Sequence, residues 1–239
     1  MHKDTVAIYE TKAEDYRRAR SPRRMEAAEA FGRLVPAGEW RVDLGCGPGR
    51  HTGALGGPVV ALDAAPAMVR AARAAHPGVF GVAADLEALP FRRGALRGGW
   101  ASMTYHHFPR ERLPMALAEL HGALAVDAPV DLTAVGGEYS GTAYPNDDFP
   151  GRFFAGWYDP WITDVVEGAG FTVTGHDLDP TEHGTNVHVA ARRARTLADT
   201  VGPGMRLLVC GLNPSIYAAD RGVGYARPGN RFWPAARLA

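Results

Sequence analysis

Three glycines at alternate positions, directly after an apolar run, constrain this chain more than any other feature. Residues 42–44 (Val-Asp-Leu) lead into residues 45–49 (Gly-Cys-Gly-Pro-Gly), so a short buried strand is expected to end in a tight turn. Glycines let the backbone turn sharply and approach a ligand without an intervening Cβ. A helix that begins at such a turn presents free amides to an anionic group. The segment therefore predicts a strand, a ligand-binding loop and a helix.

Short apolar runs alternate with stretches of helical periodicity through most of the chain. Helices are expected at 8–34 with a break near Ser21-Pro22, and at 66–75, 110–125 and 160–169. Strands are expected at 41–44, 59–63, 79–84, 99–104, 130–135, 171–176 and 186–191. This alternation predicts an α/β fold with a mostly parallel, seven-stranded sheet covered on both faces. The last two strands have no long helix between them, so we expect an antiparallel hairpin at the sheet edge.

Acidic residues stand at the ends of three of these expected strands. Asp43 closes the first strand, Asp63 ends the second, and Asp85 follows the third. The carboxyl ends of parallel strands meet at one edge of the sheet, where an open α/β fold binds its ligands. A carboxylate at Asp63 suits the two hydroxyls of a ribose.

A glycine loop followed by a ribose-binding acid also suits a nicotinamide dinucleotide. Two details disfavour that reading. The spacing is Gly-x-Gly-x-Gly instead of Gly-x-Gly-x-x-Gly, and Asp43 precedes the loop directly. A carboxylate there repels a pyrophosphate and attracts the ammonium group of a methionine moiety.

Segments 42–50, 59–69, 81–91 and 99–109 resemble, in order and spacing, the motifs of small-molecule class I methyltransferases of the type 11-like kind. The resemblance covers about residues 5–195 and implies a Rossmann-like sheet and S-adenosylmethionine as cofactor. It implies that the glycines line the methionine part, that Asp63 binds the ribose and Asp85 the adenine amino group, and that Met68 contacts the adenine. Asp85 as a helix N-cap and Met68 as a core residue remain open alternatives. The implied cofactor-binding residues are Asp43, Gly45, Gly47, Gly49, Asp63, Met68 and Asp85.

The acceptor side of the expected site gives weaker signals. The fourth strand runs into His106 and His107, and in related enzymes this stretch faces the sulfonium. Either histidine is a candidate general base; in the alternative, one packs on the following helix and the other contacts cofactor or solvent. The aromatic-rich connection 136–158 predicts a lid or substrate wall and favours an apolar or aromatic acceptor; the alternative is a hydrophobic lid without acceptor contact. Tyr9 and Tyr16 resemble the aromatic positions of the family's lid helices, with a hydrophobic seam as the alternative.

Missing patterns and composition narrow the choice of function. An Asn/Asp-Pro-Pro-Tyr motif is absent, and Cys46 lies in the glycine loop, which argues against two classes of nucleic-acid methyltransferase. The formal net charge is zero, so the whole molecule is not an electrostatic nucleic-acid binder. Cys46 and Cys210 are far apart and build neither a disulfide framework nor a metal site. With no apolar run of about 18 residues and no secretory signal, we expect a cytoplasmic protein without a membrane partner.

Residues 205–239 carry a different pattern. An apolar run at 205–210, expected to be a strand, leads into Gly-Leu-Asn-Pro at 211–214, and Pro-Gly-Asn-Arg-Phe-Trp follows at 228–233. This order resembles the start of mismatch-specific uracil/thymine DNA glycosylases. The resemblance implies that Asn213 positions the attacking water and that Tyr225 stacks on a flipped base. Only the front of such an α/β domain is present, so we expect an inactive fragment with few contacts to residues 1–195.

The sequence thus predicts a methyltransferase domain at 1–195, a linker at 196–204 and an incomplete glycosylase fragment at 205–239. The main hypothesis is methyl transfer from S-adenosylmethionine to an unidentified small molecule. One alternative is the front part of a methyltransferase–glycosylase fusion in base-excision repair, in which DNA is a partner only of a complete glycosylase. Another is a Rossmann-like domain that binds the cofactor without catalysis, since Asp43, Asp63 and Asp85 indicate binding alone.

Overall fold

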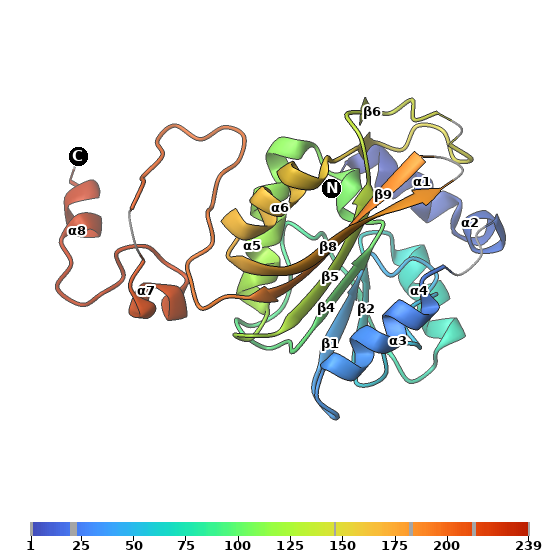
Figure 1. Cartoon of the computed structure of the whole chain (residues 1–239), viewed down its shortest axis with the longest axis horizontal. Coiled ribbons are helices and arrows are strands. Elements are labelled where there is room, and N and C mark those ends of the chain that lie inside the picture. The colour runs from blue at the N-terminus through green and yellow to red at the C-terminus, as the bar shows by residue number, and fades with distance from the viewer. Residues whose placement is uncertain (1, 20–22, 146, 182–183, 212–213, 239) are drawn as a thin grey trace.

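A single seven-stranded sheet organises the chain, in the order β3-β2-β1-β4-β5-β9-β8 (Figure 1). The computed structural model describes residues 2–19, 23–145, 147–181, 184–211 and 214–238. The first five strands in that order are parallel, and β9 pairs antiparallel with both β5 and β8. This confirms the mostly parallel sheet with an antiparallel edge hairpin. The strands are β1 (Arg41–Leu44), β2 (Val59–Asp63), β3 (Phe80–Ala83), β4 (Gly99–Ser102), β5 (Pro129–Val135), β8 (Phe171–Thr181) and β9 (Gly184–Arg193).

Helices cover both faces of the sheet (Figure 1). On one face, Trp100 of β4 packs on Phe31 of α3, and Ala61 of β2 clusters with Ala72 of α4. The opposite face carries α5 and α6. The helices are α1 (Lys3–Thr11), α2 (Ala13–Ala19), α3 (Met25–Leu34), α4 (Pro66–Ala75), α5 (Leu113–Ala123), α6 (Asp159–Gly168), α7 (Ile216–Arg221) and α8 (Phe232–Ala236). The chain also has two short 3₁₀ helices, Tyr105–His107 and Arg110–Arg112. A separate two-stranded sheet consists of β6 (Ser140–Gly141) and β7 (Phe154–Ala155).

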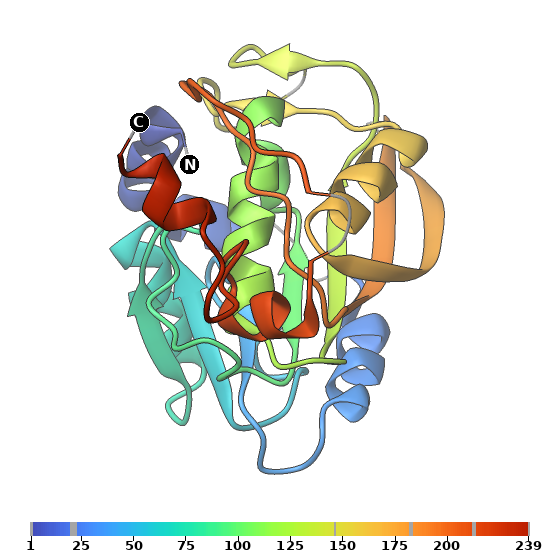
Figure 2. The same cartoon turned by 90° about the vertical axis from the view of Figure 1, so that its left-hand side faces the viewer.

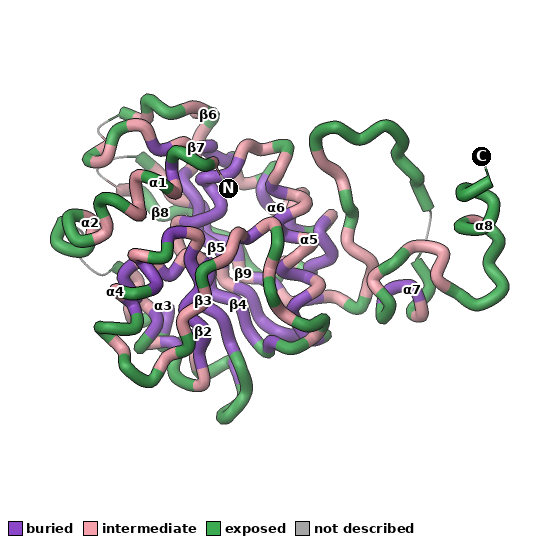
Figure 3. Tube along the Cα trace, turned by 180° about the vertical axis from the view of Figure 1, so that it is seen from behind, coloured by how far each residue is buried: buried purple, intermediate pink, exposed green. Residues whose placement is uncertain are grey.

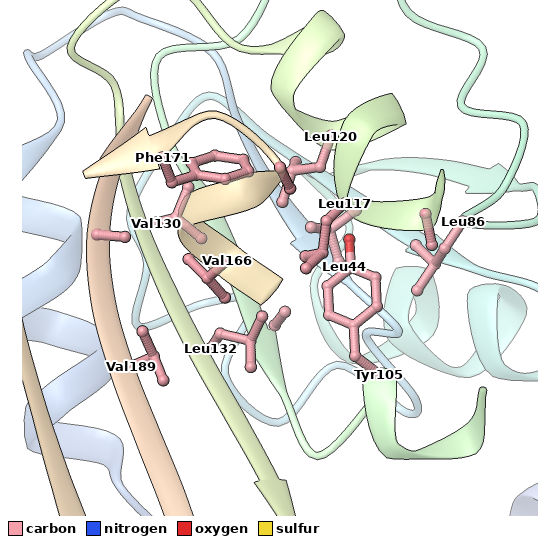
Figure 4. Close-up of a cluster of buried hydrophobic side chains, with 14 of the residues drawn as sticks. Leu44, Leu86, Tyr105, Leu117, Leu120, Val130, Leu132, Val166, Phe171 and Val189 are labelled. Atoms are coloured by element: carbon pink, nitrogen blue, oxygen red, sulfur yellow. The ribbon is translucent and has the colours of Figure 1, made fainter. Parts of the chain in front are cut away.

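The largest apolar core lies between the sheet and helices α5 and α6 (Figure 4). Leu117 and Leu120 are spaced along one side of α5, where the helical period brings them against Leu44, Val130 and the other strand residues. Full burial of each such side chain contributes about 1.5–3 kcal/mol. This core fixes the strands, so the loops at their carboxyl ends have a rigid support.

A carboxylate at the end of α1 ties that helix to the carboxyl edge of the sheet. Glu10 accepts a hydrogen bond of 2.6 Å from the backbone N–H of Ala67 and forms an ion pair with Arg70 at 2.9 Å. Both partners lie in the first turns of α4, whose N-terminal amides have no partner within the helix. The interaction lowers the pKa of Glu10, chiefly through the Ala67 hydrogen bond. The N-terminal helices are thereby held beside the loop that follows β2.

The segment after β9 lies over α5 (Figure 2). Helix α7 docks there, because Arg93 donates hydrogen bonds to the carbonyls of Ala219 at 2.6 Å and Asp220 at 3.0 Å. Arg195 adds two hydrogen bonds to the Asp220 carboxylate, at 2.9 and 2.8 Å. At α7, then, these hydrogen bonds tie the segment 205–239 to the rest of the chain.

The apolar run at 205–210 does not form the strand that the sequence predicts. Its residues are exposed and belong to no helix or strand, and the tube of Figure 3 is green over much of the segment that follows β9. A strand needs a neighbouring backbone to complete its hydrogen bonds, and no described strand lies beside this run. Tyr225 stacks on Phe232 with ring centroids 4.2 Å apart, and Asn213 lies outside the described residues.

Candidate cofactor and acceptor site

A cavity of about 470 Å³ opens at the carboxyl edge of the sheet. Its lining runs from Asp63 at the end of β2 to Asn186 on β9, and it includes Tyr9 and Tyr16 from the N-terminal helices. Tyr144, Arg152 and other residues of the 136–158 connection line it as well. The cavity is therefore bounded by the sheet edge, the N-terminal helices and this connection, as the lid hypothesis expects.

The glycine loop after β1 adopts backbone angles that favour glycine. Gly45, Gly47 and Gly49 have φ values of +64°, +53° and +83°. A Cβ at Gly45 would lie 2.3 Å from the Thr104 hydroxyl, and one at Gly49 would lie 2.9 Å from the Cα of Ala72. At Gly47 the nearest atom is 3.9 Å away, on Tyr16. Gly45 and Gly47 line the cavity, whereas Gly49 brings the loop close to α4.

Two buried carboxylates lie at and behind this loop. Asp63 lines the cavity and accepts hydrogen bonds from the backbone N–H groups of Gly47 at 3.0 Å and Ala65 at 2.9 Å. Burial raises the pKa of Asp63 to about 6 in spite of these bonds. Asp43 is 2% exposed and accepts a 2.6 Å hydrogen bond from Thr52, and burial raises its pKa to about 7. The two carboxylates make this end of the cavity favourable for a cationic ligand.

The other expected cofactor residues divide between the cavity and its surroundings. Met68, in the first turn of α4, lines the cavity and is 1% exposed. Asp85 accepts a hydrogen bond of 3.1 Å from the N–H of Glu87 and is not among the residues of the lining. That bond is of the local type that the capping alternative describes. The structure thus brings Gly45, Gly47, Asp63 and Met68 together at the cavity, with Asp43 and Gly49 behind them.

The neighbouring histidines have different surroundings, although both line the cavity. His107 Nδ1 lies 2.6 Å from the carbonyl of Phe153, so it carries the proton, and Nε2 accepts from the Tyr9 hydroxyl at 2.8 Å. Burial lowers the pKa of His107 to about 4, which keeps the ring neutral. The Nδ1 atom of His106 is buried without a hydrogen-bond partner among the described residues, and burial lowers its pKa well below the usual value. His107 is committed to protein contacts, and His106 has a ring nitrogen available to a ligand.

Arg152 joins the lid elements and gives no signal in the sequence. It is 4% exposed, donates to the Tyr9 hydroxyl at 2.8 Å and pairs with the equally buried Asp147. Its guanidinium also lies 5.3 Å from the centroids of Tyr9 and Phe149 and 5.1 Å from that of Phe154. Arg152 therefore connects α1 with the 136–158 connection around one buried charge, and Tyr9 extends the network to His107.

A second polar cluster that sequence reasoning missed lies on the sheet near β5. Arg24 donates to Asp131 at 2.9 Å and to the hydroxyl of Thr133, which also lies 3.0 Å from His188 Nδ1. Arg24 adopts φ +57° just before α3, and it lies 107 residues from Asp131 in the sequence. Such a contact leaves no local pattern. The left-handed backbone of Met103, with φ +57° after β4, is likewise invisible in the sequence.

Two kinds of site have no support in the part of the chain that the structure describes. No group of three or more His, Cys, Asp or Glu side chains is arranged to hold a metal ion. No described helix is long and apolar enough to cross a lipid bilayer.

Comparison with known proteins agrees with this geometry. Residues 42–127 match a family described as the methyltransferase domain, and this range contains the glycine loop, β2, β3, β4 and all of β1 except Arg41. The Burkholderia thailandensis 1,6-didemethyltoxoflavin-N1-methyltransferase, solved with its substrate and S-adenosylhomocysteine, has 20% identity and a TM-score of 0.63. That alignment covers 79% of this chain and 87% of the other.

Two further solved methyltransferases share the fold. The magnesium protoporphyrin IX methyltransferase of Synechocystis PCC 6803, with bound S-adenosylmethionine, has 16% identity and a TM-score of 0.55 over 79% of this chain and 81% of that one. The geranyl diphosphate C-methyltransferase of Streptomyces coelicolor has 15% identity and a TM-score of 0.59 over 72% and 77%. The chain thus has the class I, Rossmann-like fold of these methyltransferases, and residues 42–127 match the methyltransferase domain.

Proposed function

We propose that this chain transfers a methyl group from S-adenosylmethionine to a small molecule bound in the same cavity. The observation that carries the proposal is the continuity of that cavity, from the glycine loop and Asp63 at one end to His106 and Asn186 at the other. A volume of about 470 Å³ lies within the range of small-molecule sites. Its position under the N-terminal helices and the 136–158 connection favours a small acceptor over a polymer.

The proposed roles of the cofactor residues follow from their places in the cavity. Asp63 accepts the ribose hydroxyls, and Gly45 and Gly47 leave room for the methionine part. Asp43 acts through its charge on the ammonium group from behind the loop. Met68 contacts the adenine, and we assign Asp85 to the turn that leads to Glu87.

Methyl transfer is an in-line displacement, so positioning supplies most of the catalysis. A lone pair of the acceptor attacks the methyl carbon, the C–S bond breaks, and its electron pair returns to sulfur to give S-adenosylhomocysteine. An acceptor that must lose a proton releases it to water. The low pKa of His106 makes its ring a poor base, so we assign it the task of orienting the acceptor through Nδ1.

Transfer of isotopically labelled methyl groups tests this proposal. The full chain is incubated with methyl-labelled S-adenosylmethionine and a small-molecule extract, and the label is followed into small molecules, nucleic acid and protein. We expect label in a small molecule, and far less with His106→Ala, while Asp164→Asn on the exposed side of α6 behaves as wild type. Label confined to nucleic acid or protein contradicts a small-molecule acceptor.

The division of the chain at 1–195, 196–204 and 205–239 also remains a proposal. The resemblance of the last segment to glycosylases rests on the order of its motifs. The stacking of Tyr225 on Phe232 is compatible with that resemblance but does not depend on it. If the resemblance reflects ancestry, we expect no uracil release by this chain, because base excision needs a closed pocket and a wedge in the duplex.

A further inference from the structure

The cavity is longer than the part that the cofactor residues line. Adjacent strands lie about 4.8 Å apart, so the four steps from β2 through β1, β4 and β5 to β9 span about 19 Å. The glycine loop and Asp63 lie over β1 and β2, which leaves the end over β5 and β9 for the acceptor. We call the cavity surface formed by Ser102, Thr133, Val135 and Asn186 the acceptor floor.

Strand register places these floor residues on one face of the sheet. Ser102 of β4 pairs with Thr133 of β5, and Val135 of β5 pairs with Asn186 of β9. Paired residues share a face, and residues two apart on a strand do too. Ser102, Thr133 and Asn186 therefore present hydroxyl and amide groups side by side toward one region of the cavity.

The polar residues of the acceptor floor differ in whether their side chains already have hydrogen-bond partners in the protein. The Thr133 hydroxyl is engaged by Arg24 and His188. Within the described ranges, neither the Ser102 hydroxyl nor the Asn186 side-chain amide has a hydrogen-bond partner, although both residues are half-buried. These two groups are therefore open to hydrogen bonds from a ligand in the cavity.

The charges around the cavity leave no surplus for an ionic acceptor. Four arginines and four aspartates line it, so their formal charges cancel. Arg24 is paired with Asp131 and Arg152 with Asp147, both at low exposure. An anionic acceptor that took Arg24 or Arg152 from its partner would leave a carboxylate in a poorly solvated site.

A flat aromatic wall stands above the turn that follows β4. His106 stacks on Phe154 with centroids 5.2 Å apart and an interplanar angle of 7°, and Tyr144 stacks on Phe154 at 4.5 Å. All three rings line the cavity. Such a wall favours a planar ligand, and His106 Nδ1 adds one more unpartnered polar atom to it.

We propose that the methyl acceptor is an uncharged, planar molecule with hydrogen-bonding groups on its edge, and that Asn186 and Ser102 determine its specificity. The inference rests on the proposed function, since it identifies the acceptor class for the same cavity. Asn186 offers both a donor and an acceptor, and Ser102 offers a hydroxyl that serves as either. A molecule that satisfies both is preferred over an isosteric anion.

Ligand-observed NMR on the full chain saturated with S-adenosylhomocysteine tests this inference with two probes of the same shape, benzamide and benzoate. Calorimetry first establishes that S-adenosylhomocysteine binds. If it does not bind, the proposed function itself is contradicted, and not only the class of acceptor. We expect benzamide to bind and benzoate to bind at least about tenfold more weakly. Asn186→Leu should weaken benzamide about tenfold, as expected for loss of its hydrogen bonds, and leave S-adenosylhomocysteine affinity unchanged.

The matched control is a substitution in the same β8–β9 hairpin at a residue outside the cavity. Ser102→Ala should weaken benzamide severalfold, whereas Thr172→Val, at an exposed position of β8, should leave it as in wild type. Benzoate binding as tightly as benzamide overturns the inference. So does benzamide binding that is unaffected by Asn186→Leu, or binding of neither probe to the loaded protein.

Discussion

The two ends of the cavity are built in different ways. The end that we propose for the cofactor consists of backbone turns and carboxylates that follow directly on strands, with Asp43, Gly45 and Gly47 inside five consecutive residues. The acceptor end is assembled from contacts between distant segments, such as the hydrogen bond from Tyr9 to His107 across 98 residues and that from Arg152 to Tyr9 across 143. We therefore expect a local motif to bind a cofactor that is common to many enzymes, and distant segments brought together by the fold to bind the acceptor.

This difference predicts that a substitution at one end of the cavity can impair ligand binding there without changing binding at the other end. Substitutions in the glycine loop should act on folding and cofactor affinity. Those in the network around Arg152 should act on the lid and the acceptor. The following predictions test that separation, beginning with the largest expected effect.

Arg152→Met should destabilise the folded chain by about 3–5 kcal/mol, because it leaves Asp147 buried without its partner. Urea unfolding measures the change. Adding Asp147→Asn should recover much of the loss, since the uncompensated charge is removed. Arg70→Met, which breaks an exposed ion pair with Glu10, is the control and should cost much less. Equal effects at Arg152 and Arg70 would show that the buried network is not needed.

Gly45→Ala should destabilise the chain by about 3 kcal/mol, because it adds a clash with Thr104 to the strain of a positive φ. Gly38→Ala provides a matched control. Its φ is +79°, and a Cβ there meets nothing within 4 Å, so only about 1 kcal/mol is expected. Thermal unfolding compares the two variants, and similar losses would contradict close packing of the loop on Thr104.

Asp43→Asn should stabilise the ligand-free chain at pH 8 by an amount on the order of 3 kcal/mol. Burial raises the folded-state pKa of Asp43 to about 7, above the unfolded value of about 3.9. The folded chain therefore binds this proton more tightly, and Asp43 costs stability that grows as pH rises from about 4 to 7. The difference between variant and wild type should vanish near pH 4, as unfolding at several pH values can show. A constant difference across that window would refute the assignment.

Asp63→Ala should weaken binding of S-adenosylhomocysteine by about 1.5–3 kcal/mol through loss of charge-assisted hydrogen bonds. Calorimetry measures the dissociation constant, and benzamide binding to the loaded variant reports whether the acceptor end is intact. An unchanged dissociation constant would mean that Asp63 does not bind the ribose.

The sequence predicted the elements that depend on local pattern. All seven strands of the sheet and the glycine turn follow from periodicity and from residues that adopt unusual φ. The positions of Gly45, Gly47, Asp63 and Met68 at one cavity agree with the motif, whereas Asp85 lies outside its lining. Nothing local marks Arg152, Arg24 or Asn186, because their surroundings come from tertiary contacts. At 205–210 the local pattern predicts a strand that the structure does not contain, because an apolar run forms a strand only beside a neighbouring strand.

Direct titration of the full chain with S-adenosylhomocysteine and with NAD tests the cofactor assignment at the centre of this account. The acid beside the glycine loop and the Gly-x-Gly-x-Gly spacing predict that S-adenosylhomocysteine binds and that NAD binds much more weakly, because Asp43 repels a pyrophosphate. Calorimetry gives both dissociation constants under the same conditions. Tighter binding of NAD than of S-adenosylhomocysteine would contradict the account.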